Sequence, residues 1–191
     1  ASIDAQIAYA PTAMELLKNQ TRTVDAPLNG TYPRTGKAIT ILKTSAGDIR
    51  INLIHRHAAC NDAAFEKLIE AKYFNNTSCH RMFNSEQGSV LQCGDPTGTG
   101  MGDPGFYTPD ELPEYLINAA GAEYGMQAQQ ITYPKGTVAV ANSGPNTGSG
   151  QFFIALTDTQ LAPSYTVIGV VDPADFSILD LSLIHISEPT R

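Results

Sequence analysis

The chain has 191 residues, of which 42% are apolar and 16% are charged, and this composition predicts one globular domain with its own hydrophobic core. Its net charge of −7 and its 12 scattered basic residues argue against a nucleic-acid partner, because phosphate binding depends on clustered lysine and arginine. The sequence contains no apolar run near the roughly 20 residues that cross a bilayer, so we expect no membrane span in this chain.

Residues 1–36 predict a linker-like N-terminal arm. Pro11, Pro27 and Pro33 stand among polar turn formers, and apolar periodicity is weak in this stretch. The chain begins at Ala1 rather than at Met, which is consistent with a signal or anchor segment upstream. We therefore favour an exported or membrane-anchored parent protein slightly over a cytoplasmic one.

The pattern changes after the arm, first to strands and then to a helix. Isoleucines alternate with other residues on both sides of a turn at residues 47 and 48, which predicts a β-hairpin over residues 39–53. Asn61 then offers an N-cap, and Asp62 lies in the first turn, where the helix dipole favours an acidic side chain. Apolar residues at i, i+3 and i+4 spacing complete the helix signal; they are Phe65, Leu68 and Ile69.

The rest of the chain predicts many short strands. Apolar runs indicate strands at residues 79–83, 90–92, 137–141 and 151–156. Residues 107–134 look like a long insertion between them. Short strands with two helices at most predict a mainly β fold, a closed antiparallel barrel capped by one or two α-helices.

Two ordered blocks of sequence carry recognisable motifs. Residues 79–81 read Cys-His-Arg, and residues 91–100 read Leu-Gln-Cys-Gly-Asp-Pro-Thr-Gly-Thr-Gly. Residues 136–154 set a loop of Gly, Pro, Asn and Ser between two apolar strands. Together the blocks resemble the signatures of the cyclophilin-type peptidyl-prolyl isomerases, and the wording of the first is closer to a bacterial branch. The resemblance implies an isomerase domain over residues 37–180.

The resemblance implies an enzyme that accelerates the cis–trans isomerisation of X-Pro bonds in folding or flexible polypeptides. Rotation about an amide C–N bond meets a barrier of about 18–20 kcal/mol because resonance gives it double-bond character. A cationic donor to the prolyl nitrogen beside an apolar pocket would weaken that resonance, so we expect neither a cofactor nor a metal. We also expect a monomer. The alternative is a proline-peptide binding module or chaperone with little turnover.

The resemblance also assigns roles to particular residues. Arg81 would supply the cationic donor, Gln92 would orient it, and the backbone of Asn142 would hold the extended substrate. Without the flanking motifs, Arg81 would be interpreted as an ordinary surface arginine. The remaining groove residues implied by the resemblance are Val90, Ala141, Gln151, Phe153, Leu161 and Tyr165. His80 is interpreted as a hydrogen-bonded structural histidine, because the reaction transfers no proton.

Two positions depart from the family pattern. Ser89 stands where a pocket phenylalanine is expected, and Gln160 stands where many members carry tryptophan. We therefore expect a shallower pocket and weak binding of cyclosporin, which usually contacts that indole. Both departures also motivate the binding-module alternative.

The three cysteines lack the spacing of a zinc site. Cys79 and Cys93 could meet in a hairpin, but side chains alternate faces along a strand, so Cys79 would share the face of Arg81 while Cys93 points away. We therefore expect two half-buried thiols rather than a disulfide, unless a bulge intervenes.

Residues 181–191 are expected to be a non-native tail. They resemble the translated sequence of a transposase adapter used in DNA library preparation. Cyclophilins normally continue after the stretch matching residues 165–169 with a helix and a last barrel strand, and the sequence here lacks most of that helix and all of that strand. We therefore expect a barrel that is missing its closing strand, which would expose unpaired N–H and C=O groups on both neighbouring strands.

Overall fold

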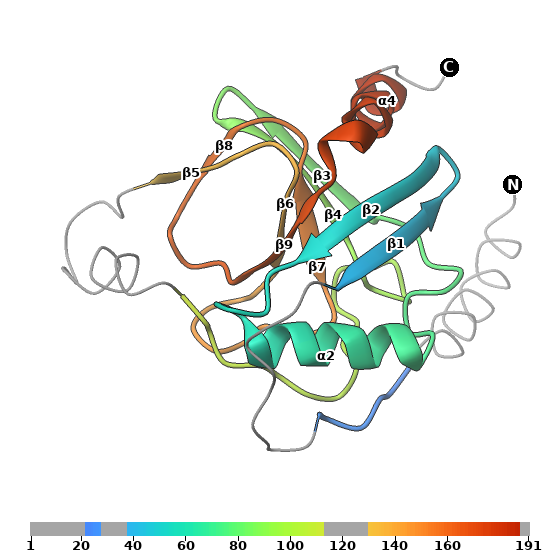
Figure 1. Ribbon diagram of the computed structural model, residues 1–191, viewed down its shortest axis with the longest axis vertical. Coiled ribbons are helices and arrows are strands. Elements are labelled where there is room, and N and C mark those ends of the chain that lie inside the picture. Colours follow the sequence, from blue (N-terminus) through green and yellow to red (C-terminus); the bar gives the residue numbers. More distant parts are fainter. Residues whose placement is uncertain (1–21, 28–37, 113–129, 188–191) are drawn as a thin grey trace, which may run out of the picture.

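The computed structural model describes residues 22–27, 38–112 and 130–187 of the chain. Most of the predicted arm and residues 113–129 of the predicted insertion lie outside these ranges. The described fold is mainly β, with one large antiparallel sheet, one small sheet and two α-helices (Figure 1). No described helix is both long enough and apolar enough to cross a bilayer.

The large sheet contains seven strands in the order β1-β2-β9-β6-β7-β4-β3. Their bounds are β1 (Ile39–Thr44), β2 (Gly47–Leu53), β3 (Arg81–Ser85), β4 (Gly88–Cys93), β6 (Thr137–Val140), β7 (Phe152–Ala155) and β9 (Val167–Val171). All their pairings are antiparallel, as the hairpin signals and short strands predicted. A second sheet pairs β5 (Ile131–Tyr133) with β8 (Thr159–Leu161).

The sheet is open in the part of the chain that the structure describes. Its ladder ends at β1 on one side and at β3 on the other, and these two strands do not pair. The closed barrel predicted from the number of short strands is therefore not found among the described residues. The number of short strands predicts an antiparallel sheet. Whether the sheet closes depends on pairing between its two outermost strands, which local sequence patterns do not predict.

Helix α2 (Ala59–Glu70) begins earlier than predicted. Its N-cap is Ala58, which makes no side-chain capping bond, so the expectation that Asn61 caps the helix was wrong. The carboxylate of Glu111 instead accepts from the backbone N–H groups of Cys60 at 3.1 Å and Asn61 at 2.8 Å. A residue about fifty positions away thus satisfies the free donors of the first turn, which a local capping pattern cannot reveal.

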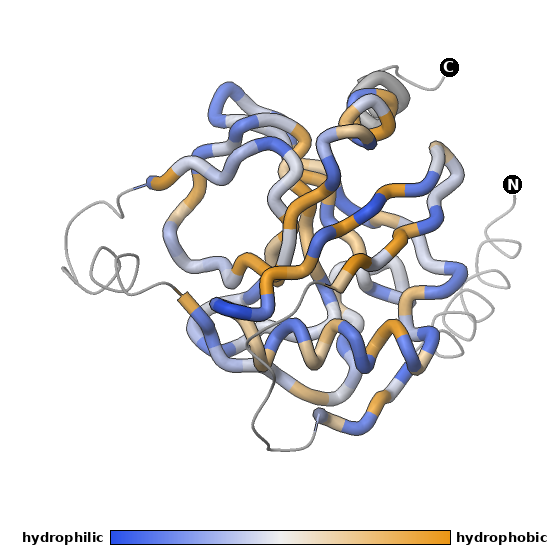
Figure 2. Tube along the Cα trace, viewed as in Figure 1, coloured by the Kyte–Doolittle hydropathy of each residue, from blue (hydrophilic) through white to orange (hydrophobic). Residues whose placement is uncertain are grey.

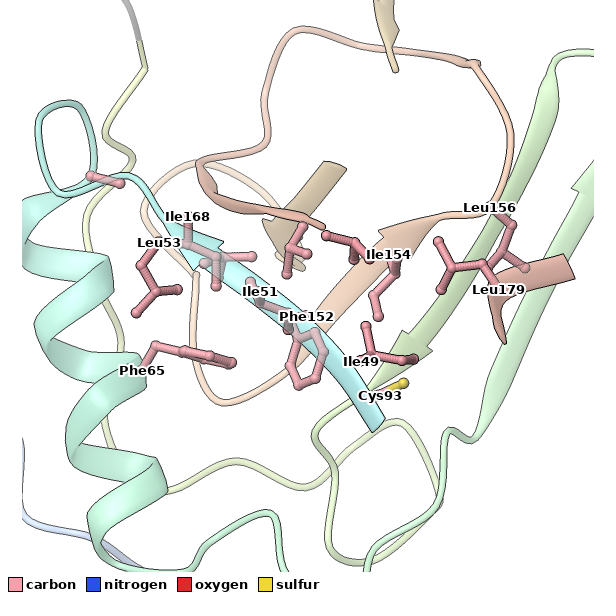
Figure 3. Packing of buried hydrophobic residues seen from close by; sticks show 14 residues of the cluster. Ile49, Ile51, Leu53, Phe65, Cys93, Phe152, Ile154, Leu156, Ile168 and Leu179 are labelled. Carbon is pink, nitrogen blue, oxygen red and sulfur yellow. The ribbon is translucent and has the colours of Figure 1, made fainter. Parts of the chain in front are cut away.

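The main core lies against one face of the large sheet (Figure 3). Apolar and polar residues alternate along β1 and β2 (Figure 2), so one face of β2 buries Ile49, Ile51 and Leu53. Phe65 from α2 and Leu179 from α4 (Phe176–Ser187) close this core from opposite ends of the sheet. Helix α4 follows the short 3-10 helix η1 (Pro173–Asp175) and runs without a break across the expected domain end at residue 180.

A disulfide joins Cys79 and Cys93, so the expectation of two free thiols was wrong. The argument assumed that strand alternation extends back to Cys79. Strand β3 begins two residues later, at Arg81, and the register is irregular just before it, because the N–H of His80 donates to Gln92 O at 3.1 Å although Gln92 is already paired with Arg81. Cys79 is therefore free to turn towards Cys93, whose side chain belongs to the core (Figure 3).

Candidate active site

One row of side chains crosses four neighbouring strands. Arg81 in β3 is paired with Gln92 in β4, Gln92 with Phe153 in β7, and Phe153 with Ala139 in β6. Directly opposite residues in antiparallel strands lie on the same face of a sheet. We call these four residues the Arg81 row, and three of them are residues that the sequence assigned to the groove.

The Arg81 row lies on the sheet face opposite the main core. The residues one position along, which include Met82, Leu91, Ile154 and Val138, belong to or pack against that core. Because successive side chains alternate, the Arg81 row points the other way. A permanently charged guanidinium, an amide and an aromatic ring thus share the non-core face of the sheet, where the ring of Phe153 is 4% exposed.

A second row on the same face carries Val90. Val90 is paired with Phe83 on one side and with Ala155 on the other. Phe83 is 39% exposed, so it adds an apolar ring beside Val90 that the groove assignment did not include. Ser89 points to the other face and is 3% exposed, with its hydroxyl donating to Asn84 Oδ1 at 2.6 Å. Position 89 therefore does not line the groove.

An aromatic cluster covers part of this face. The rings of Phe153 and Tyr165 meet edge to face with centroids 5.2 Å apart, and Tyr133 lies 6.3 Å and 6.2 Å from these two rings. The Tyr133 hydroxyl donates to Ala162 O at 3.1 Å. Leu161 lies on β8 opposite Ile131 of β5, the strand that carries Tyr133.

Sequence reasoning missed Tyr133 because it fell inside the predicted insertion. The available signal was the alternation of Ile131, Thr132 and Tyr133 before Pro134, which is typical of a short strand. The predicted insertion included these residues instead. In the structure this strand supplies a ring that Phe153 and Tyr165 both contact.

Two glutamines connect the Arg81 row to the glycine-rich loop. Gln92 Nε2 donates to Gln151 Oε1 at 2.8 Å. Gln151 Nε2 donates in turn to Gly100 O at 3.0 Å and to Gly102 O at 2.9 Å. The predicted residues Gln92 and Gln151 are thus brought into direct contact.

A pocket of about 300 Å³ lies beside these glutamines. Four of the predicted groove residues line it, namely Gln92, Ala141, Asn142 and Gln151. The side chain of Asn142 donates to Ser164 O at 2.8 Å and so braces the loop after β6. A larger cavity of about 580 Å³ lies between residues 22–25 and the end of α2 and contains none of the predicted site residues.

Two histidines are largely buried, and one of them, His80, differs from its interpretation from the sequence. Both ring nitrogens of His80 are buried, and neither has a hydrogen-bond partner among the described residues, so the expected hydrogen-bonded histidine is not seen. His55 is 9% exposed, and its Nδ1 lies 3.1 Å from Asp62 Oδ2. Burial, reinforced by Glu66 and Glu111, raises the pKa of Asp62 to about 8.

The described parts of the chain bring together no group of three or more His, Cys, Asp or Glu residues suited to a metal ion. Residues 39–183 match the family model described as cyclophilin type peptidyl-prolyl cis-trans isomerase/CLD. The chain belongs to the cyclophilin family. The match covers the whole of the large sheet and both rows on its non-core face.

Several cyclophilin relatives resemble this chain along most of its length. A probable peptidyl-prolyl cis-trans isomerase B of Mycobacterium tuberculosis (strain ATCC 25618 / H37Rv) is 34% identical over 181 residues, covering 94% of this chain. The protein of the same name from Mycobacterium leprae (strain TN) is 37% identical over 175 residues, covering 90% of this chain. In both comparisons the chain spans 56% of the relative's length.

Solved cyclophilin structures share the fold. A Cryptosporidium parvum cyclophilin type isomerase superposes with a TM-score of 0.60 at 26% identity, covering 76% of this chain and 83% of that one. The same protein solved in the presence of the dipeptide Ala-Pro gives a TM-score of 0.58 at 25% identity, covering 75% and 84%.

Proposed function

We propose that this cyclophilin catalyses the cis–trans isomerisation of X-Pro bonds in polypeptides. The observation that carries the proposal is the Arg81 row, in which Arg81, Gln92 and Phe153 occupy directly opposite positions of three neighbouring strands. This arrangement places a permanent cation near an aromatic side chain. The cation can donate a hydrogen bond to the prolyl nitrogen as the bond rotates, and the aromatic side chain can contact the proline ring.

The chemistry rests on weakening amide resonance in the transition state. As the C–N bond rotates, the prolyl nitrogen becomes pyramidal and regains a lone pair that can accept a hydrogen bond. A guanidinium N–H donated to that lone pair stabilises the twisted state more than either planar isomer. Each ~1.4 kcal/mol of such selective stabilisation raises the rate tenfold. In this scheme Arg81 is the electrophilic donor and Gln92 holds its orientation.

The remaining groove residues would bind the peptide. Phe153, Val90, Leu161 and Tyr165 would contact the proline ring, and Phe83 would extend that apolar surface. Tyr133 is 2% exposed, so it would support the rings of Phe153 and Tyr165 rather than meet the peptide. Ala141, Asn142 and Gln151 would hold the extended main chain on the other side, next to the 300 Å³ pocket. The Cryptosporidium relative was crystallised in the presence of Ala-Pro, which supports a proline peptide as the ligand class.

The second candidate is a proline-peptide binding module or chaperone with little turnover. Gln160 favours it, because a polar amide there, hydrogen-bonded to Thr132 Oγ1 at 2.6 Å, replaces the indole of many family members. Such a protein would bind the peptide without accelerating its rotation.

The deciding experiment follows a short X-Pro peptide by NMR exchange, which measures binding and isomerisation in one sample. We expect the full chain to accelerate exchange and Arg81→Ala to lower kcat/KM about 100-fold, the factor for losing hydrogen bonds from a charged donor. Arg81→Lys should recover little, because an ammonium lacks the planar fork. Arg56→Ala, at an exposed arginine, is the matched control. Binding without acceleration by the folded wild-type chain would favour the binding module.

We further propose that a closed barrel forms when one more strand pairs with β1 and β3, and that the isomerase domain of residues 37–180 acts as a monomer. The motivation is that β1 is an outermost strand of the described sheet and also exposes apolar side chains, Ile39 at 63% and Ile41 at 52%. An edge of this kind is prone to pair with another strand. Hydrogen exchange tests this: the β1 amides that face away from β2 should exchange quickly, and protection of those amides would show that something already covers this edge.

A further inference from the structure

The glycine-rich loop after β4 is folded around one buried carboxylate. Asp95 is fully buried, and its Oδ1 accepts from both the N–H and the hydroxyl of Thr97, each at 2.7 Å. Its Oδ2 accepts from the N–H groups of Thr99 at 3.1 Å, Gly100 at 2.6 Å and Gly102 at 3.2 Å. Five donors from a single loop therefore converge on one side chain.

These donors suit the ionised form of Asp95. Burial alone would raise the pKa of this carboxyl group, but the hydrogen bonds from Thr97, Gly102 and Gly100 outweigh it and lower the pKa. Charge-assisted hydrogen bonds of this kind are about twice as strong as neutral ones. The loop conformation thus depends on the Asp95 charge.

The same loop holds Gln151 by its carbonyl groups. Gly100 O and Gly102 O both accept from Gln151 Nε2. An amide side chain has a donating end and an accepting end, so fixing Nε2 on two carbonyls leaves Oε1 to face Gln92. Gln92 then turns its own Nε2 towards Gln151, at 2.8 Å.

We propose that Asp95 is a positioning residue of the isomerase site, which acts through the Gly100 and Gly102 carbonyls and Gln151 to set the amide orientation of Gln92 beside Arg81. With Nε2 occupied, Gln92 offers Oε1, an acceptor, to the guanidinium. The reversed amide would point its NH2 group at the cation, and two donors cannot hydrogen-bond each other. This inference rests on the proposed function.

The packing at Gly102 supports a tightly held loop. A Cβ atom added at Gly102 would overlap Asp95 Oδ1 and would lie 2.9 Å from its Cγ. Only glycine fits here without moving the carboxylate or the carbonyl that binds Gln151. A substitution at position 102 would therefore disturb the contact between the loop and Gln151 without removing the charge of Asp95.

The test compares Asp95→Asn with Asp172→Asn in the full chain. Both variants neutralise a carboxylate that accepts from backbone N–H groups, since Asp172 Oδ1 accepts from Ala174 N at 3.0 Å, but Asp172 precedes η1 and lies outside the groove. The direct readout is solvent exchange of the Gln151 side-chain amide by NMR. We expect about tenfold faster exchange in Asp95→Asn, the factor for losing an ordinary hydrogen bond, and no change in Asp172→Asn.

Activity provides the second readout. Asp95→Asn should lower kcat about tenfold with little change in KM, because Arg81, whose orientation Gln92 holds, bonds the prolyl nitrogen only in the transition state. In a Gln151→Ala background the same substitution should lower kcat hardly any further, because the effects of residues that act through the same contacts are not additive. Gly102→Ala should reproduce the faster exchange and the lower kcat, and it decides the question if Asp95→Asn fails to fold.

Three results would overturn the proposal: unchanged Gln151 exchange in the folded variants, unchanged kcat, or an equal cost of Asp95→Asn with and without Gln151. The exchange readout needs no turnover. If the wild-type chain proves inactive, the proposed function fails and this inference fails with it, even where exchange shows that Asp95 orders Gln151.

Discussion

At the residue scale, we attribute the ligand preference expected of this groove to Gln160. It lies on β8, opposite Thr132 of β5, and its amide is tied to that neighbour rather than offered to a ligand as an apolar surface. Large apolar ligands gain affinity from aromatic contact area, which an amide cannot supply.

We predict weak cyclosporin binding by the wild-type chain and binding at least about tenfold tighter by Gln160→Trp, because burying a large apolar side chain contributes roughly 1.5–3 kcal/mol. Isothermal titration calorimetry measures both. Thr132→Val is the matched control, since it breaks the same hydrogen bond without adding a ring, and it should leave affinity unchanged. A tight wild-type dissociation constant would contradict the argument.

The β3–β4 hairpin is the element that carries both Arg81 and Gln92, and a disulfide ties its open end. The cysteines are 14 positions apart, so the bond restricts a short loop of the unfolded chain. In the chain-entropy account, a loop of this size contributes about 3 kcal/mol of stability.

We expect Cys79→Ser to lower the free energy of unfolding by about 3 kcal/mol in urea titrations. Cys79 is exposed, so the change leaves the core intact. Adding a reductant should lower the stability of the wild type to a similar level and leave Cys79→Ser unaffected. Cys60→Ser, at the free cysteine, is the control. A wild type insensitive to reductant would refute the structural role of this bond.

Helix α2 contains a carboxylate whose burial makes stability depend on pH. The native pKa of Asp62 is raised to about 8, so between its ordinary value and 8 the native state holds a proton that the unfolded state has lost. By linkage, stability is then greatest at low pH and falls as pH rises through this window. The charged and titratable groups near Asp62 are His55, Glu66 and Glu111.

Asp62→Asn should remove that slope. We expect its stability relative to wild type to rise by about 1 kcal/mol or more between pH 5 and pH 8, as judged by urea unfolding at each pH. Glu70→Gln, at the exposed end of α2, should show no such trend. A parallel pH dependence of wild type and Asp62→Asn would show that Asp62 keeps an ordinary pKa.

At the scale of the whole molecule, an ion pair at the start of the C-terminal helix attaches it to β2. Arg50 on β2 donates to both carboxylate oxygens of Asp175, at 2.7 Å and 2.9 Å, and its backbone N–H donates to the same group at 2.8 Å. Asp175 ends η1, directly before α4. Bidentate pairs of this kind fix geometry as well as energy.

We expect Asp175→Asn to increase hydrogen exchange along α4 at pH 7. Hydrogen bonds from Arg50 lower the pKa of Asp175 to about 2, so its contribution is present above the ordinary pKa near 4 and is lost as pH falls towards 2. Wild type should therefore lose α4 protection between pH 4 and pH 2, while the variant starts low and changes little. Equal protection at pH 7 would show that the apolar contacts of α4 and the ion pair between Lys135 and Asp180 suffice without Asp175.

Local patterns in the sequence predicted the short strands and helix α2, and motifs around Arg81, Gln92 and Phe153 indicated a cyclophilin. Both signals depend on residues that are close together in the sequence. Tertiary structure alone decided which side chains meet. The capping of α2 by Glu111, the bond between Cys79 and Cys93, the ring of Tyr133 and the open edges of β1 and β3 all depend on pairing between distant segments. Such pairing follows from register and packing, which no single stretch of sequence specifies.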